Sequence, residues 1–153
     1  MSEDDRERSG GGSPGALAGG GLSAEDDHER LLARYETLRA EIAGRAVARD
    51  RATSEALAAQ RAAHRGETLA WQHLSELREA RRAAPGDLSL VAAADQAEAA
   101  WETARSQAEQ VNRKAADVAR RALEDSEADG RMLHELGLRV RAARLASRRP
   151  RPQ

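Results

Sequence analysis

The chain has 153 residues, of which 40% are apolar and 33% are charged, and its formal net charge at pH 7 is −1. It contains no Phe, one Tyr and two Trp, which excludes a thick globular core and favours long helices with thin packing. The absence of Cys excludes disulfides, a thiolate nucleophile and a Cys-based zinc site.

The first 22 residues are acidic and then rich in glycine. They begin with the run Glu3-Asp4-Asp5 and continue with glycines at positions 10–12, 15 and 19–21. Such a segment cannot bury enough apolar surface to offset the entropy of ordering, so we expect residues 1–22 to form a disordered tail. No signal-peptide pattern is present, and no apolar run approaches the roughly 18 residues of a membrane helix. These features favour a cytoplasmic protein.

A first long helix is predicted over residues 23–84. Ser23 is suited to cap its N-terminus, because three carboxylates follow in the first turn, where they stabilise the helix dipole. Small and apolar residues then recur at alternating spacings of four and three, the heptad pattern of a coiled coil, with two consecutive arginines as interruptions. This predicted seam, the row of positions expected to face a partner helix, is Leu31, Tyr35, Leu38, Ile42, Arg45, Arg49, Ala52, Ala56, Ala59, Ala63, Gly66, Ala70, His73, Leu77, Ala80 and Ala84.

A turn is predicted over residues 85–89, because Pro85 and Gly86 stop the first helix and Asp87 or Ser89 can cap the next. The second helix is predicted over 90–147, with a break allowed near Gly130, and residues 149–153 form a short basic tail that contains Pro. Its predicted seam, interrupted by two consecutive aspartates, is Leu90, Ala94, Ala97, Trp101, Ala104, Ala108, Val111, Ala115, Val118, Ala122, Asp125, Asp129, Met132, Leu136, Arg139 and Ala143.

The short turn predicts that the two helices run antiparallel as neighbours, an all-α hairpin of the coiled-coil kind. If the last position of the first seam faces the first position of the second, facing residue numbers sum to 174. In that register Arg45 faces Asp129 and Arg49 faces Asp125, so the two interruptions coincide. Because polar layers in coiled coils fix register, we interpret these four residues as a register-setting layer rather than a binding or catalytic site.

A cluster of apolar residues near the turn is a candidate partner surface. Trp71, Leu74 and Trp101 lie there, and a bare two-helix rod cannot cover all the apolar residues that flank its seam. An isolated hairpin with so thin a core would also be marginally stable. We therefore expect either a protein partner or self-association.

The sequence offers no constellation that carries chemistry. No two of the four His residues lie three or four positions apart on one helix face, and His73 falls in the predicted seam opposite Trp101, where we interpret it as a packing residue. A two-helix rod has no concave pocket in which to align a nucleophile and a base. We expect no enzymatic activity, no cofactor, no metal site and no small-molecule substrate.

The two ends of the chain carry opposite charge. Residues 1–30 hold eight Asp/Glu and three Arg, whereas residues 131–153 hold seven Arg and one Glu. The basic end could contact phosphates of nucleic acid or an anionic membrane, although no aromatic residues are interleaved with it. Attraction between the two ends, or simple solvation, is the competing interpretation. The arginines concerned are Arg139, Arg141, Arg144, Arg148, Arg149 and Arg151.

Residues 23–148 resemble, in outline, the stalk proteins of flagellar and type III secretion export ATPases. The shared features are an antiparallel two-helix coiled coil of this length, a short turn, scattered Arg and Glu on the outer faces and a basic C-terminus. The resemblance implies a hairpin that sits in or beside a hexameric ATPase ring and carries export chaperones or subunits.

Three functional hypotheses remain at this point. The leading one is a non-enzymatic coiled-coil interaction or scaffold protein, the second is the export-ATPase stalk, and the third is a nucleic-acid or membrane-surface binder that uses the Arg-rich end. The Ala- and Arg-rich usage is typical of a GC-rich bacterial genome.

Overall fold

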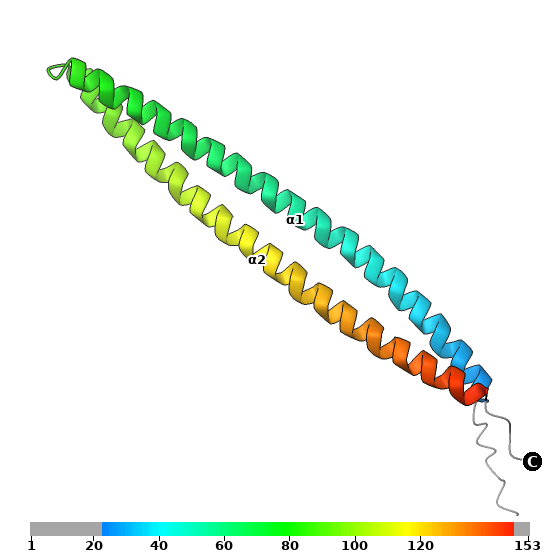
Figure 1. Cartoon of the computed structure of the whole chain (residues 1–153). Helices are drawn as coiled ribbons and strands as arrows, with labels where there is room; N and C mark the ends of the chain where they lie inside the picture. The colour runs from blue at the N-terminus through cyan, green and yellow to red at the C-terminus, as the bar shows by residue number, and fades with distance from the viewer. Residues whose placement is uncertain (1–22, 149–153) are drawn as a thin grey trace, which may run out of the picture.

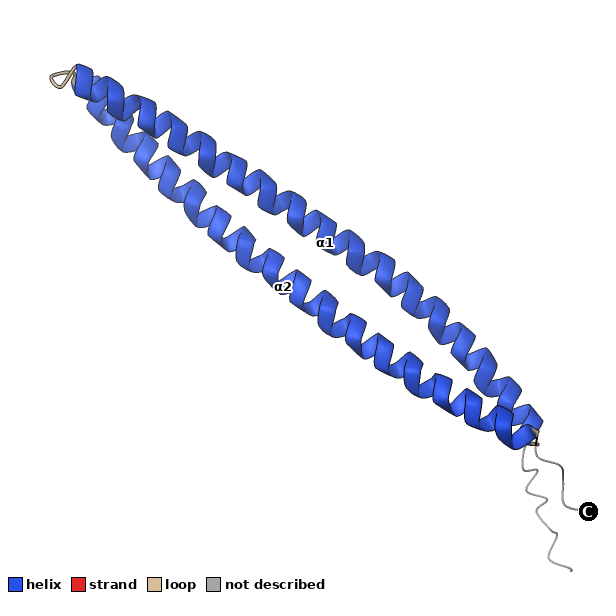
Figure 2. Cartoon of the chain, viewed as in Figure 1, coloured by secondary structure: helices blue, strands red, loops and turns tan. Residues whose placement is uncertain are grey.

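The computed structural model describes residues 23–148 and consists of two helices joined by one turn (Figure 1). Helix α1 spans Ala24–Ala83 and α2 spans Leu88–Ser147, each with 60 residues, so the rod is about 90 Å long. The two helices lie antiparallel along their whole length, and the described part of the chain contains no strand (Figure 2). The predicted all-α hairpin is confirmed. The predicted disordered N-terminal tail and basic C-terminal tail lie outside the described residues.

Helix α1 begins at a capping box. The Ser23 hydroxyl accepts a hydrogen bond from the Asp26 amide at 3.1 Å, and the Asp26 carboxylate accepts one from the Ser23 amide at 3.1 Å. Two backbone donors that the first turn would leave unpaired are thereby satisfied. The start of the helix is therefore dictated by local sequence, as the Ser23 pattern predicted.

The turn is shorter than predicted, and α2 begins two residues earlier. Ala84 leaves helical geometry because Pro85 follows it, and the Asp87 amide donates to the Ala84 carbonyl at 3.1 Å to close the turn. Asp87 is the N-cap, since its carboxylate accepts hydrogen bonds from the Ser89 and Leu90 amides. The sequence left the cap open between Asp87 and Ser89, and starting the helix at Leu90 was wrong.

Helix α2 continues without interruption through Gly130, so the break allowed there is absent. A Cβ built at Gly130, or at Gly44 on α1, would meet no atom within 4 Å. Neither glycine is needed for a close approach of the helices. Each is tolerated because the backbone hydrogen bonds of a long helix continue past a single weak helix former.

The core is a thin line of small side chains with larger ones at the two ends. Leu74 near the turn is fully buried, and the other buried apolar residues are Leu31, Ala94, Ala97, Ala108 and Leu136. Between Ala46 and Ala70, the positions of α1 that face α2 carry no large apolar side chain. Because apolar stabilisation scales with the area buried, the middle of the rod is held less strongly than its ends.

The observed seam of α1 leaves the predicted heptad after Ile42. It takes a second consecutive four-residue step to Ala46 and then shares only every other position with the prediction. A straight helix has 3.6 residues per turn and drifts about 20° per heptad from a 3.5-residue repeat, so an extra four-residue step restores contact with the partner helix. The half-buried or buried residues are Thr53, Gln60, Glu67 and Leu74, and the exposed ones are Ala52, Ala59, Gly66 and His73, which were wrongly placed in the seam.

The same shift occurs in α2 at the same level of the rod. After Asp129 the inward positions are Leu133 and Val140, whereas Met132 and Arg139, predicted in the seam, are exposed. Both helices therefore change phase beside the charged layer, and the phase of each seam is set locally rather than by one repeat.

Candidate functional site

The charged layer joins the two helices about one third of the way from the open end, the end at which α1 begins and α2 finishes. Arg45 Nη2 lies 2.6 Å from Asp129 Oδ1, and Arg49 Nη1 lies 2.6 Å from Asp129 Oδ2. Arg45 Nε also donates to Oδ2 at 3.4 Å. The Asp129 side chain is 7% exposed and the Arg49 side chain 16%. One buried carboxylate thus receives two charge-assisted partners from the neighbouring helix.

Arg45 and Asp129 are in contact, as the register predicts, but the pairing of Arg49 with Asp125 is wrong. Asp125 is exposed, because the inward positions of α2 at this level are Ala128 and Asp129. The phase shift brings Asp129 to the middle of the seam, within reach of arginines on two successive turns of α1. Three residues, not four, form the layer.

The electrostatics of the layer follow from these hydrogen bonds. The bond from Arg45 and then the bond from Arg49 lower the pKa of Asp129 below its ordinary value of 3.8, against the opposing effect of burial. The same contact raises the pKa of Arg45. Asp129 is therefore held ionised and acts as an acceptor only, which suits a structural tie rather than a proton-transferring group.

Acid should weaken the hairpin through this carboxylate. Because the pKa of Asp129 is lower in the folded chain than in the unfolded one, ionised Asp129 stabilises the fold above about pH 4, and this stabilisation is lost as the pH falls through the lowered folded value. We expect the difference in Tm between wild type and Asp129→Asn to stay constant from about pH 7 to pH 5 and to shrink below about pH 4. Thermal melts followed by circular dichroism measure it.

The comparison of wild type with Asp129→Asn isolates the contribution of the Asp129 carboxylate to stability. The capping carboxylates of Asp26 and Asp87 also have lowered pKa values, because each accepts hydrogen bonds at its helix start, but both are present in wild type and variant alike. A difference in Tm that is undiminished at about pH 2.5 would contradict the assignment of Asp129 as an ionised acceptor.

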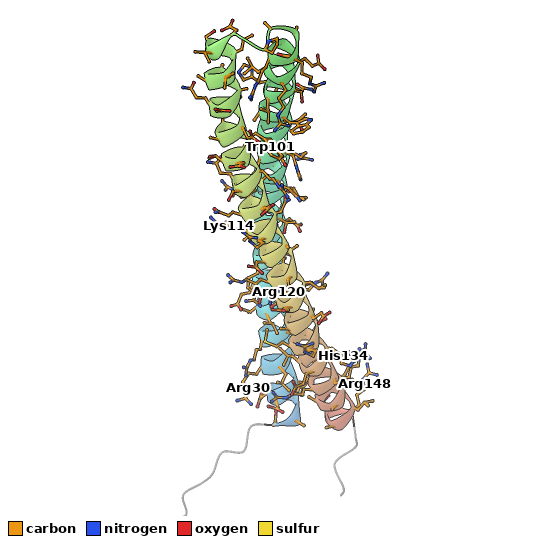
Figure 3. All side chains as sticks on the ribbon, turned by 90° about the vertical axis from the view of Figure 1, so that its left-hand side faces the viewer. Arg30, Trp101, Lys114, Arg120, His134 and Arg148 are labelled. Carbon is orange, nitrogen blue, oxygen red and sulfur yellow. The ribbon has the colours of Figure 1, made fainter. Side chains whose placement is uncertain are left out.

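The tryptophan patch lies toward the closed end, the end that carries the turn, and Trp101 marks it in Figure 3. The rings of Trp71 on α1 and Trp101 on α2 are tilted by 53°, with centroids 5.1 Å apart. Arg78 lies over the Trp71 ring at 5.8 Å, and Arg105 lies over the Trp101 ring at 5.7 Å. Arg78 also reaches Glu98 on the other helix at 2.8 Å. We call these five residues the tryptophan patch.

The patch keeps the two Trp residues of the predicted partner surface and loses Leu74. Leu74 has no exposed surface and packs inside the seam, so its assignment to a partner surface was wrong. Trp71 is 45% exposed and Trp101 is half-buried, so both rings reach the surface. The arginines were missed, although Arg78 follows Trp71 by seven positions and Arg105 follows Trp101 by four, spacings that share a helix face.

The part of the basic end that the structure describes, up to Arg148, exposes its arginines to solvent. Within residues 23–148, no carboxylate lies within ion-pair distance of the four described arginines of this end, whereas several arginines elsewhere on the rod are paired. Within residues 23–148, therefore, no ion pair supports the predicted attraction between the two ends of the chain. Arg149 and Arg151 lie outside the described residues. The four are Arg139, Arg141, Arg144 and Arg148.

Two further observations bear on the chemistry of the rod. In the described segment, no group of three or more His, Asp or Glu side chains is arranged to hold a metal ion. Neither α1 nor α2 has a stretch apolar enough to cross a membrane.

Comparison with protein-family models, with curated proteins and with solved structures finds no match.

Proposed function

We propose that this chain is a non-enzymatic interaction or scaffold protein that binds a protein through the tryptophan patch. The observation that carries the proposal is the pair of surface Trp rings, one from each helix, each with an Arg over it. Trp and Arg are the residues most enriched where binding energy concentrates in protein interfaces. Their clustering on one rod end supports a contact made there.

The physical basis of the contact is desolvation of a rigid aromatic surface. A Trp ring that is 45% exposed leaves apolar area in water, and a partner that covers it recovers the free energy of burial. Arg78, which contacts Glu98, lies over the Trp71 ring, and Arg105 lies over the Trp101 ring, so both rings have neighbours that limit their motion before binding. A preformed patch of this kind favours a specific partner over non-specific adhesion.

The partner is either a different protein or a second copy of the chain. The patch carries both signs of charge, because Arg78 and Arg105 lie beside Glu98 and Glu109. A surface of mixed sign can meet a second copy across a two-fold axis as well as an unrelated protein. Light scattering of the purified chain across a concentration series separates these two cases.

The export-ATPase stalk is a narrower form of the same function. The feature that supports it is the two-helix hairpin itself, which is the architecture on which the resemblance rests. A stalk should co-purify with a hexameric ATPase in stoichiometric amounts. A scaffold of another system should bring down a different protein through the same patch.

Substitution of both rings should abolish partner binding. We expect Trp71→Ala with Trp101→Ala to weaken the affinity by at least about 100-fold, because truncated aromatic anchors commonly cost about 2 kcal/mol or more each. The measurement is a quantitative pull-down with the full chain, followed by titration of the purified partner. Because the chain has only these two Trp residues, intrinsic fluorescence reports on the patch directly, and binding should shift its emission to the blue.

Leu69→Ala is the matched control. Leu69 is 65% exposed on the same helix and lies outside the patch, so its removal should leave the affinity unchanged. Trp71→Phe with Trp101→Phe keeps an apolar ring at each position and should retain part of the binding. This variant tests the patch even if the double alanine variant does not fold. Equal partner recovery by wild type and by a folded double alanine variant contradicts the proposal.

A further inference from the structure

A second surface lies on the outer face of α2 at the open end, far from the tryptophan patch. His134, Leu138, Arg141, Leu145 and Arg148 follow one another at spacings of four, three, four and three, so they form one stripe on the helix. All five are exposed, and Figure 3 labels the first and the last of them near the end of the rod. Leu138 is 50% and Leu145 65% exposed. We call this set the basic stripe.

The stripe combines positive charge with apolar side chains and contains no carboxylate. No acidic residue follows Glu135 in the sequence, and six arginines lie between it and the C-terminus. Among residues 23–148, Arg141 and Arg148 have no carboxylate within ion-pair distance, in contrast to Arg120, which contacts Asp117 at 2.9 Å on the same helix. The positive charge of the stripe is therefore available to an external anion.

Two classes of polyanion could meet this charge, and the leucines distinguish between them. Nucleic acid takes up Arg through its phosphates and stacks its bases on aromatic rings, and the stripe has no aromatic ring other than the imidazole of His134. A lipid surface accepts both kinds of side chain at once, because Leu enters the acyl boundary while the long Arg side chains extend to the headgroups. The alternation of Leu138, Arg141, Leu145 and Arg148 matches the second case.

We propose that the basic stripe binds the surface of an anionic lipid bilayer, with the end of α2 lying in the interface. Arg141 and Arg148 contact headgroup phosphates, and Leu138 and Leu145 insert beside them. The hairpin is attached at its open end, and the tryptophan patch lies toward the other end of the rod. This site is separate from the patch and does not depend on the function proposed for it.

The test is flotation of the full chain with vesicles of two compositions. Pure phosphatidylcholine should leave the protein unbound, and vesicles with about 30% phosphatidylglycerol should bind it in a manner that weakens with salt. Each Arg near a charged surface contributes about fivefold in partition, so Arg141→Glu with Arg148→Glu should lower binding by at least about 25-fold. Circular dichroism confirms that the variants keep their helices.

Two matched variants decide the interpretation. Arg113→Glu with Lys114→Glu changes charge equally at exposed positions in the middle of α2 and should lower binding far less. Leu138→Ala with Leu145→Ala keeps the charge and should still lower binding severalfold, an effect that phosphate contacts alone would not produce.

Three results overturn the proposal. The first is equal binding to vesicles with and without phosphatidylglycerol. The second is equal loss of binding in the Arg141/Arg148 and Arg113/Lys114 variants. The third is unchanged vesicle binding in the leucine variant together with tighter binding to a DNA or RNA oligonucleotide, which would assign the stripe to nucleic acid.

Discussion

Replacing Leu74 by Ala should destabilise the hairpin by about 2–3 kcal/mol and lower its Tm by about 10 °C. Among the large side chains of residues 23–148, only Leu74 has no exposed surface. A thin core has few neighbouring side chains that can move to fill the cavity that the substitution leaves. The loss combines the transfer of the removed atoms to water with the residual cavity. Urea unfolding and thermal melts followed by circular dichroism measure it.

Two neighbours on α1 are the controls for this variant. Leu69→Ala removes the same atoms from a side chain that is 65% exposed and should change stability by about 0.5 kcal/mol or less. His73→Ala tests the strict heptad, which places His73 in the seam in place of Leu74. A larger loss from His73→Ala than from Leu74→Ala would mean that the phase shift after Ile42 is wrong.

Asp129→Asn should destabilise the hairpin at the charged layer, with a loss in Tm of about 5 °C or more. The substitution keeps the shape of the side chain and removes its charge. Arg49, whose side chain is 16% exposed, would then lie in the seam without a counter-charge, and removal of one partner from a buried pair costs more than the pair contributes. Thermal melts at about pH 7 and low salt provide the measurement.

Asp125→Asn is the matched control for the layer. Asp125 is exposed, so its substitution should change the Tm by no more than about 2 °C. Charge exchange gives a second test: Asp129→Arg should be strongly destabilising, and the addition of Arg45→Asp with Arg49→Asp should restore much of the loss. Equal effects of the two asparagine variants would support the pairing of Arg49 with Asp125 and contradict the three-residue layer.

The two helices and their boundaries, apart from the start of α2, were predictable because their signals are local. Ser23 with Asp26 forms a capping box that spans four residues, and Pro85 with Gly86 stops a helix wherever the pair occurs. The contact of Arg45 with Asp129 was predictable for a related reason: a short turn fixes which residues of two antiparallel helices share a level. These features require no knowledge of how the helices rotate.

The sequence did not determine the rotation of each helix about its own axis, which decides which residues face the other helix. A change of phase is visible in a sequence when large apolar residues move to new positions, and in the middle of α1 the positions that face α2 carry none. Ala52 and its neighbour Thr53 differ little in the apolar area that they could bury, and the same holds for Ala59 and Gln60. The sequence was therefore consistent with a strict heptad. The placement of Leu74, His73 and Asp125 all depended on that choice.

The tryptophan patch shows the same division. Facing levels bring Trp71 and Trp101 together in any register near the predicted one, so their contact followed from the turn. The positions of Arg78 over one ring and Arg105 over the other depend on side-chain direction around each helix, which is settled only once the phase is known. The basic stripe was likewise recognised in the sequence only as a cluster of arginines. That these arginines share one helix face with exposed leucines is clear from the structure.

The position of the described chain ends at one tip of the rod has a mechanical consequence (Figure 1). A load applied across Ser23 and Arg148 would peel the helices apart turn by turn, because in this geometry contacts break in sequence rather than together. The buried Leu31 and Leu136 and the ties to Asp129 would break first, and the alanine-rich middle would then part under little extra force. Leu74 and the two Trp rings would separate last, so a hairpin under tension would keep its closed end assembled until almost all of its length had opened.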